Sequence, residues 1–229
     1  MRIHLSPRLQ RLADYVQPGS TVVDVGTDHA YLPIWLLQNG ISGAAYATDI
    51  RPGPLKNAAS DAEAAGVRGE LTLLLCDGLA LCPPDRVDTV VIAGMGGETV
   101  MGILRAAPWA LQKRMILQPQ TKLRELRAYL AAAELRIDDA SLVYDNGRIY
   151  QVWSVGAGAM DPLRWVDPSL PAKRDPLLLQ YAEDRIKRLR KEIHGLEQAK
   201  NRDESRLEDL RQGLTEFIEI HKEAERWQA

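Results

Sequence analysis

The segment TVVDVGTDHAYLP, residues 21–33, decides the fold. Its first part, Thr21 to Val25, is a short β-branched run of the kind that forms a buried strand. A turn around Gly26 follows, and the segment continues into a helix-forming stretch. Glycine suits this turn because it adopts backbone conformations that other residues resist, and it lets a ligand approach closely. A strand, a turn and a helix in this order begin a parallel α/β unit, whose turn presents backbone N–H groups to a ligand.

Short β-branched runs continue to alternate with helix-forming stretches as far as residue 155. The further candidate strands are residues 44–48, 71–75, 89–92, 114–117, 136–144 and 148–155, and the candidate helices are residues 30–39, 53–65, 97–106 and 122–133. The turn signal Asp145-Asn-Gly147 separates the last two strands and predicts a hairpin. We therefore predict a mostly parallel α/β sheet of seven strands that ends in an antiparallel pair. A helix is predicted ahead of the sheet, with its N-terminal cap at Ser6-Pro7. Its apolar residues at helical spacing are Leu5, Leu9, Leu12 and Val16.

The C-terminal part of the chain has a different pattern. Residues 156–171 are rich in Gly, Ala and Pro and predict a linker. Two apolar seams with alternating spacings of three and four follow, made of Ile186, Leu189, Ile193 and Leu196 and of Leu207, Leu210, Leu214 and Phe217. The intervening residues 197–206 are almost wholly polar, which favours a turn near Asn201 and an antiparallel coiled-coil hairpin over one long dimerising helix. We place the boundary between a domain of residues 1–160 and the linker and hairpin of residues 161–229.

Composition narrows the class of protein. The 29 Lys and Arg residues nearly balance the 31 Asp and Glu residues, so a nucleic-acid partner would need a local basic patch. Such a cluster lies between Arg185 and Lys191, and it is either a solvated helix face or a phosphate-binding surface. No apolar run approaches the ~20 residues of a membrane span, and the start of the chain lacks a secretory signal, so we expect a cytoplasmic protein. Cys76 and Cys82 are expected to be free thiols, and the scattered histidines predict no metal site.

Carboxylates and glycines stand at the ends of successive candidate strands. Asp24 and Asp28 flank Gly26, and these acids would repel a pyrophosphate. The GxGxxG pattern of dinucleotide enzymes is absent, so a cationic cofactor fits better. Asp49 lies 25 positions after Asp24, where α/β nucleotide sites place an acid for ribose hydroxyls. The candidate cofactor-binding segments at the ends of the third and fourth strands are Cys76-Asp77-Gly78 and Ala93-Gly-Met-Gly-Gly97.

The chain resembles the S-adenosylmethionine-dependent methyltransferases of the Rossmann-like class. More narrowly, it is similar to the bacterial tRNA (adenine(22)-N1)-methyltransferase family, TrmK, over nearly its whole length. The motifs that carry the resemblance, besides the C-terminal hairpin, are LSPRL at residues 5–9, DVGTDHAYLP at 24–33, AGMGG at 93–97 and LQP at 117–119. Gln120 stands where the family usually has Asn. The resemblance implies a class I methyltransferase fold, S-adenosyl-L-methionine as cofactor, and methylation of N1 of an adenosine in tRNA.

The resemblance and the basic cluster together imply three groups of site residues. The cofactor would be held by Asp24, Gly26, Thr27, Asp28, Asp49, Ile50, Asp77, Gly78, Ala93 and Gly94. The predicted catalytic residues are Asp28, Gly94, Met95 and Gly96. The predicted substrate contacts are His29, Tyr31, Gly97, Gln118, Pro119, Lys187, Arg188 and Lys191.

Structural roles remain as alternatives for several of these residues. Asp24 or Asp28 could cap a helix, and the glycines of residues 94–97 could serve close packing alone. We expect Tyr150 and Trp153 to belong to the core. Two other functions also stay open, namely methylation of a small metabolite with a dimerising hairpin, and a non-catalytic interaction module.

Overall fold

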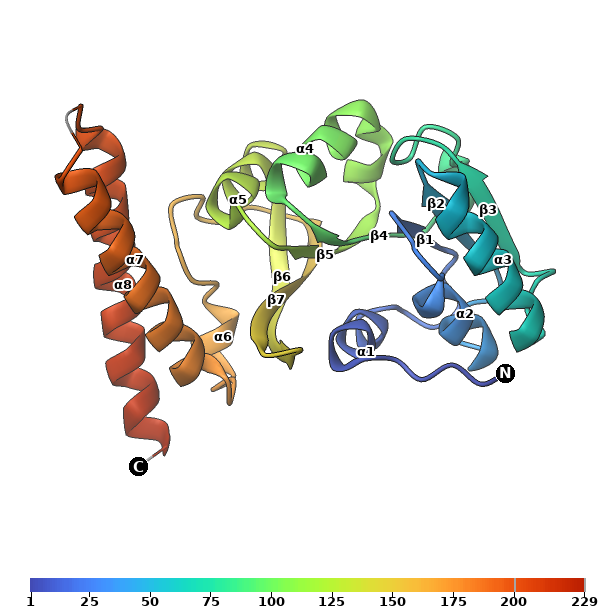
Figure 1. The fold of residues 1–229 in the computed structure, drawn as a ribbon, viewed down its shortest axis with the longest axis horizontal. Helices are drawn as coiled ribbons and strands as arrows, with labels where there is room; N and C mark the ends of the chain where they lie inside the picture. The colour runs from blue at the N-terminus through green and yellow to red at the C-terminus, as the bar shows by residue number, and fades with distance from the viewer. Residues whose placement is uncertain (200, 229) are drawn as a thin grey trace.

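The structure is a computed structural model that describes residues 1–199 and 201–228. It contains one seven-stranded sheet in the order β3-β2-β1-β4-β5-β7-β6, with helices on both faces and a helical hairpin at one end (Figure 1). The strands are β1 (Val22–Val25), β2 (Ala45–Asp49), β3 (Leu71–Leu75), β4 (Thr89–Met95), β5 (Arg114–Pro119), β6 (Leu135–Asp145) and β7 (Arg148–Ala157). The helices are α1 (Pro7–Asp14), α2 (Tyr31–Gln38), α3 (Pro52–Ala65), α4 (Gly97–Ala106), α5 (Leu123–Ala132), α6 (Ser169–Ala172), α7 (Leu178–Glu197) and α8 (Glu204–Gln228), with short 3-10 turns η1 (Pro84–Arg86) and η2 (Pro108–Gln112). The predicted fold class is confirmed.

The strand directions follow from the connections between strands. Strands β1 to β5 pair in parallel, and β7 runs antiparallel to both β5 and β6. The β6–β7 turn consists of Asn146 and Gly147, whose φ angles of 48° and 77° are those of a two-residue hairpin turn. The predicted antiparallel finish is therefore confirmed. The order reverses at the junction of β1 and β4, where open α/β sheets bind ligands.

Helices cover both faces of the sheet. Helices α1, α2 and α3 lie on one face and α4 and α5 on the other (Figure 1). Side chains of α1 and α2 form an apolar cluster with Val91 and Ile116, whereas Val90 and Met115, the preceding residues of the same strands, point into the cluster of α4 and α5. This alternation is the two-residue period of a strand buried on both faces. Helix α1 begins as predicted, because Ser6 accepts a hydrogen bond from the N–H of Leu9.

The C-terminal helices α7 and α8 lie side by side as a hairpin, which excludes the single long helix (Figure 1). Most residues of the two predicted seams are buried between these helices and the sheet domain. Tyr181 and Phe217 belong to the same apolar cluster as Trp153 of β7, and the rings of Tyr181 and Phe217 meet edge to face with centroids 5.9 Å apart. Within the described residues, no helix has the length and apolar character that crossing a membrane requires.

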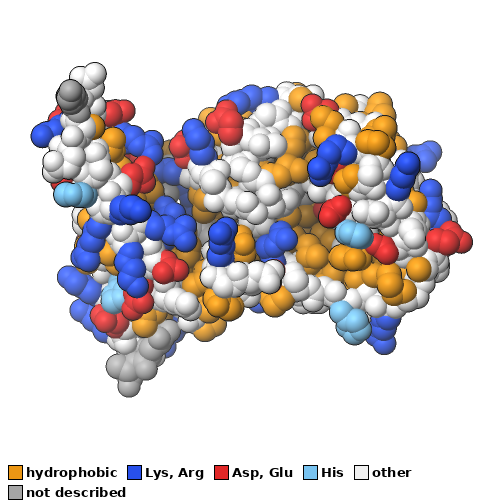
Figure 2. All heavy atoms as spheres, in the orientation of Figure 1, with side chains coloured by type: hydrophobic (Ala, Val, Ile, Leu, Met, Phe, Trp, Pro, Cys, Tyr) orange, Lys and Arg blue, Asp and Glu red, His pale blue; other side chains and the backbone are white. Residues whose placement is uncertain are grey.

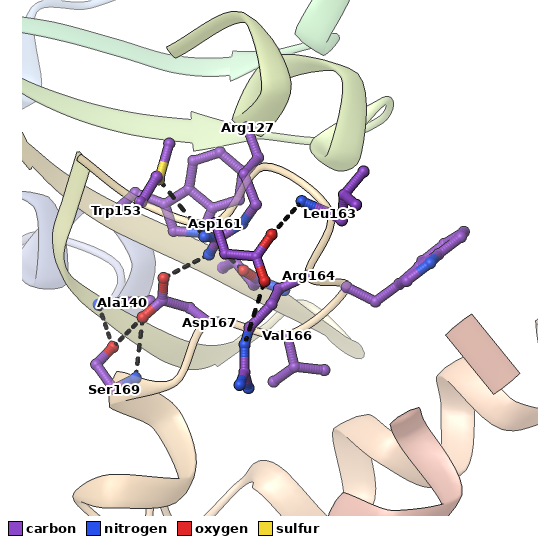
Figure 3. Close-up of polar contacts among 12 residues, drawn as sticks. Arg127, Ala140, Trp153, Asp161, Leu163, Arg164, Val166, Asp167 and Ser169 are labelled. Atoms are coloured by element: carbon purple, nitrogen blue, oxygen red, sulfur yellow. Dashed lines mark hydrogen bonds and ion pairs between the residues drawn. The ribbon is translucent and has the colours of Figure 1, made fainter. Parts of the chain in front are cut away.

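The connection between β7 and α7 is docked along its length, although its composition predicts a linker. Arg127 of α5 and Asp167 form a buried ion pair (Figure 3). The second carboxylate oxygen of Asp167 accepts hydrogen bonds from the N–H and hydroxyl of Ser169, at 3.0 and 2.6 Å. The Ser169 hydroxyl oxygen in turn accepts the N–H of Ala140 on β6 at 2.9 Å. The domain boundary that we propose after residue 160 thus precedes an ordered connection.

A second set of contacts fastens this connection to α8. The carboxylate of Glu216 accepts the backbone N–H groups of Trp165 and Val166 at 3.0 and 3.2 Å. The Trp165 ring packs where Gly213 leaves space, because a Cβ at that position would lie 2.5 Å from the ring. An ion pair between Arg124 and Asp209 joins α5 directly to α8. The orientation of the hairpin relative to the sheet is therefore fixed by contacts of α8 with the connection and with α5.

Removing one partner of the buried ion pair should destabilise the protein strongly. Asp167→Ala leaves the Arg127 guanidinium buried and unpaired, so we expect the free energy of unfolding to fall by about 3–5 kcal/mol. The double variant Arg127→Met, Asp167→Leu removes both charges and should recover most of that loss. Urea denaturation measures both effects. Asp138→Ala, which breaks the more exposed pair with Arg136, is the control and should cost at most about 1 kcal/mol; an equal effect of Asp167→Ala would contradict the prediction.

Candidate active site

The carboxyl edge of the parallel strands gathers the predicted site residues. Strands β1 and β2 bring Asp24 and Asp49 to this edge, and the turn after β3 adds Asp77 and Gly78. Strand β4 continues beyond its predicted end to Met95, through an irregularity between Ala93 and Met95. The predicted cofactor residues therefore stand around one edge, and their roles there remain predictions.

The turn between β1 and α2 is tied to β2 through its backbone. The N–H groups of Gly26 and Thr27 donate to the carbonyl oxygen of Thr48 at 2.8 and 3.0 Å. Gly26 has a φ of +75°, and a Cβ there would lie 2.1 Å from the Met95 side chain, so glycine is required. Helix α2 begins after Ala30, whose N–H donates to the Thr27 hydroxyl. Asp28 does not cap this helix, and its side chain is 74% exposed, with one carboxylate oxygen 3.9 Å from the Nε2 of His29.

Asp24 lies at the base of this edge in a partly accessible position. Burial raises the pKa of its carboxyl from 3.8 to about 6, against the opposing effects of a hydrogen bond from Thr27 and the positive charge of Arg8. No cation among residues 1–199 and 201–228 forms an ion pair with Asp24 within 4.0 Å. A cationic ligand group would therefore stabilise its ionised form.

Asp49 is buried, and one of its two carboxylate oxygens accepts a hydrogen bond from the described residues. Its Oδ1 accepts the N–H of Arg51 at 2.7 Å, with the Arg51 Nε at 3.6 Å. Within the part of the chain that the structure describes, its Oδ2 accepts no hydrogen bond and can receive a ligand hydroxyl. The neighbouring side chains of Ile50 and Leu75 are 67% and 52% exposed and offer an apolar surface beside the carboxylate. This combination suits a ribose joined to a flat base.

The loop after β3 is held close to β2. The hydroxyl of Thr48 donates to the carbonyl oxygen of Gly78 at 2.8 Å, and the N–H of Cys76 donates to that of Asp49 at 3.1 Å. These bonds place the backbone of residues 76–78 beside Asp49 at the same edge of the sheet. Cys76 and Cys82 are both free thiols, which confirms that prediction.

Gln118 holds the backbone irregularity at Gly94. The N–H of Gly94 donates to the Gln118 side-chain oxygen at 3.0 Å, and Arg8 Nη1 donates to the same oxygen at 3.0 Å. Gly94 has a φ of +76°, which favours glycine. Gln118 is fully buried. Its side-chain oxygen is occupied by these two donors and so helps to hold the turn, and its contact with the substrate stays a prediction.

Close packing explains the two later glycines of this loop. A Cβ on Gly97 would lie 2.7 Å from the carbonyl oxygens of Thr121 and Lys122, and one on Gly96 would lie 2.9 Å from the Thr121 hydroxyl. The N–H of Gly97 also donates to the Thr121 carbonyl at 2.9 Å. At Gly94, by contrast, a Cβ would meet nothing closer than 3.7 Å. Close packing alone is therefore a sufficient reason for glycine at positions 96 and 97. The predicted catalytic role of Gly96 and substrate contact of Gly97 are not needed to explain these glycines.

Arg8 is a site residue that the sequence patterns did not single out, although it lies within the LSPRL motif. It extends from α1 to Gln118, and its Nε lies 3.7 Å from Asp145 on β6. The Arg8 guanidinium also lies 5.8 Å from the centre of the Tyr150 ring. Tyr150 is thus only partly buried, whereas Trp153 belongs to the core as predicted. For Arg8, the one signal in the sequence that could have indicated a role in the site is its position in the LSPRL motif.

His29 and Tyr31 form a stacked pair with ring centroids 4.9 Å apart. Asp61 on α3 fixes the histidine ring through its Nδ1 at 2.7 Å, a partner that the sequence patterns did not reveal. Tyr31 is 37% exposed, so its ring does not close the core edge and can border a ligand. Both rings remain predicted substrate contacts.

Of the remaining predicted substrate residues, those of α7 lie apart from the strand ends, whereas Pro119 stands at one of them. Pro119 is buried at the end of β5, and Arg188 faces a cleft between the sheet and α7. Lys187 and Lys191 are exposed on α7 and line neither cavity of that cleft. Within residues 1–199 and 201–228, no group of three His, Cys, Asp or Glu side chains is arranged to hold a metal ion.

Comparison with known proteins gives consistent matches. A methyltransferase-domain family model matches residues 5–153. The tRNA (adenine(22)-N(1))-methyltransferase of Bacillus subtilis is 33% identical over 161 residues, covering 69% of this chain and 68% of that protein. The crystal structure of B. subtilis TrmK is similar over 96% of this chain and 100% of that chain, with a TM-score of 0.83 and 26% identity. A Streptococcus pneumoniae protein solved in complex with S-adenosyl-L-methionine covers 95% of this chain and 100% of its own, with a TM-score of 0.81 and 29% identity.

The raised pKa of Asp24 predicts a pH-dependent stability. Because the folded state binds this proton more tightly than the unfolded chain, stability should fall as pH rises from about 4 to 6 and then level off. Asp24→Asn removes the titration. We expect its free energy of unfolding to exceed that of the wild type increasingly across this range, by up to about 3 kcal/mol. Denaturant titrations at several pH values measure the difference, and a constant difference would contradict the assignment.

Proposed function

Because this chain belongs to the tRNA (adenine(22)-N(1))-methyltransferase family of methyltransferase-domain proteins, we propose that it transfers the methyl group of S-adenosyl-L-methionine to N1 of adenosine 22 in tRNA. The observation that carries the proposal is the pair of carboxylates, Asp24 and Asp49, at the carboxyl edge of β1 and β2. Among the described residues, Asp24 has no cationic partner within 4.0 Å, and the Oδ2 of Asp49 accepts no hydrogen bond. We place this reaction in the cytoplasm, where tRNA is found.

The residues at this edge fit the cofactor. Asp24 and Asp28 would face its cationic methionine part, together with the backbone of Gly26 and Thr27. Asp49 would accept the ribose hydroxyls through its free oxygen, and the exposed side chain of Ile50 would cover the adenine. Asp77 and Gly78 would border the same adenine, with Ala93 and Gly94 closing the site from β4. When bound, the cofactor supplies a methyl group already activated on a sulfonium.

The protein's task in such a displacement is mainly positioning. Reacting atoms need to be held about 3–3.5 Å apart and in line. The adenine N1 lone pair is available only when the base is unpaired, so the target must be unpaired or extruded into the site. The backbone of residues 94–97 would hold the amino group of the adenine, while His29 and Tyr31 would border its ring. Gln118 and Arg8 keep the Gly94 turn in its observed conformation.

Positive charge moves onto the adenine as the new bond forms. The carboxylate of Asp28 is exposed at this edge and would stabilise that charge. No general base is required, because 1-methyladenosine can remain cationic at neutral pH. The hairpin supports tRNA over a small metabolite as the substrate. Most residues of its apolar seams pack within the chain, so these seams are not available as the dimer interface that the metabolite alternative needs.

Nucleoside analysis tests the reaction directly. Unmodified tRNA incubated with the protein and labelled S-adenosyl-L-methionine should yield labelled 1-methyladenosine by mass spectrometry. Asp28→Ala should reduce the rate by about tenfold or more, the scale of one lost charge-stabilising contact. Asp85→Ala, an exposed acid in η1, is the matched control and should retain full activity. Absence of label on every nucleoside across several tRNAs would refute the function.

Asp49 gives a separate prediction for cofactor binding. Asp49→Asn replaces a charged acceptor by a neutral one, and hydrogen bonds to charged groups contribute about 1.5–3 kcal/mol. We therefore expect the Kd for S-adenosyl-L-methionine, measured by calorimetry, to rise by about tenfold to a hundredfold. The Asp85→Asn variant should bind with wild-type affinity. An unchanged Kd for Asp49→Asn would remove Asp49 from the cofactor site.

A further inference from the structure

A cleft lies between the β5–α5 region of the sheet domain and helix α7. It comprises two adjoining cavities of about 780 and 290 Å³. Figure 2 shows Lys and Arg side chains gathered where the hairpin faces the sheet domain. The residues that line both cavities are Gln120, Thr121, Leu123, Gln151, Tyr181, Arg185 and Arg188. The Arg127–Asp167 pair fixes the connection to α5, and the Arg124–Asp209 pair fixes α5 to the hairpin, so both walls of the cleft are held in place.

Three arginines of the cleft have no acidic partner. Among the described residues, Arg148 at the start of β7 and Arg185 and Arg188 of α7 form no ion pair within 4.0 Å. The Nε of Arg185 is buried without any hydrogen-bond acceptor. Asp184 is the one acidic side chain lining the smaller cavity among those residues. Leaving the Nε of Arg185 buried without an acceptor is costly, although its guanidinium also lies 5.7 Å from the centre of the Phe217 ring, and an anion in the cleft would offset that cost. The exposed guanidinium groups of Arg148 and Arg188 are accessible to the same anion.

Other basic residues of the larger cavity differ from these three. Arg127 is paired with Asp167, Arg206 with Glu192, and Arg124 with Asp209. These pairs hold the walls together and leave few donors for a ligand. The unpaired arginines are concentrated instead at the end of the cleft nearest β5 and β7.

That end of the cleft adjoins the glycine loop of the candidate active site. Gln120 lines both cavities, and its N–H donates to the carbonyl oxygen of Met95 at 2.8 Å. Thr121, the next residue, accepts the N–H of Gly97. Tyr150, which lies beneath Arg8, lines the smaller cavity. A strand leaving the active site can therefore enter the cleft directly.

We propose that this cleft is the docking groove for the tRNA strand that carries the target adenosine, with Arg148, Arg185 and Arg188 binding its phosphates. The inference rests on the proposed function and adds the surface on which the substrate is held. Arginine suits this role because its planar donors match two phosphate oxygens at once. Of the α7 residues predicted to contact the substrate, Arg188 lies in this groove, whereas Lys187 and Lys191 do not line it.

Binding measurements with tRNA test the groove. The variants Arg148→Gln, Arg185→Gln and Arg188→Gln should each raise the Kd for unmodified tRNA by about three- to tenfold. Each should also reduce the slope of log affinity against log salt by about 0.7–0.9, the value for one phosphate contact. The Kd for S-adenosyl-L-methionine should stay unchanged and confirms folding. Arg226→Gln, an exposed arginine on α8 away from the cleft, is the matched control and should change neither quantity.

The outcomes separate the groove from the proposed function. Wild-type methylation with unchanged tRNA affinity and salt slope in all three variants would overturn the groove and leave the function intact. An equal loss in Arg226→Gln would also overturn it, because the effect would then be one of overall charge. If the wild-type protein forms no 1-methyladenosine but the three variants bind tRNA more weakly than it does, the groove is supported and the proposed function is refuted. Because Arg148 is exposed at the β6–β7 turn, its variant keeps the test valid if Arg185→Gln fails to fold.

Discussion

The buried ion pair between Arg127 and Asp167 is the constraint on which the arrangement of the molecule depends. It anchors a connection rich in glycine and proline to helix α5, and Glu216 then fastens that connection to α8. A free tether of the same composition would let the hairpin sample many positions. The docked connection holds it in one position, in which α7 forms a wall of the cleft beside β5. The pair thus contributes specificity of arrangement at the cost of desolvating two charges.

The two sides of the candidate site have opposite electrostatic character. Carboxylates dominate the ends of β1 and β2, where a cationic cofactor fits, whereas unpaired arginines line the cleft toward the hairpin. The net charge of -2 conceals this separation. Between the two sides stands the Gly94 turn, whose conformation is set by Gln118 and Arg8. Each partner of the proposed reaction would therefore contact a surface suited to its own charge, and the two would meet at this glycine loop.

Local patterns were sufficient to predict most of the fold. Strand alternation, the Asn146-Gly147 turn and the apolar seams each depend on residues close together in the sequence. The carboxyl ends of parallel strands share one edge, so Asp24 and Asp49 could be placed without coordinates. Contacts between distant segments could not. Arg8 meets Gln118 across 110 positions and His29 meets Asp61 across 32. Likewise, which face of α7 lines the cleft depends on the docking of the connection, and the sequence of α7 alone does not encode it.

The shared apolar cluster of sheet and hairpin has a consequence for biosynthesis. Leu178, Tyr181 and Phe217 complete the core on the α4 and α5 side of the sheet. A ribosome adds about 5–20 residues per second, so α8 emerges seconds after β7 has been made. During that interval the side of the sheet that the hairpin will cover stays open, and it includes Trp153 of β7. The last helix is thus a folding element as well as a wall of the cleft, and a nascent chain halted before it would carry an uncovered apolar surface of the kind that chaperones bind.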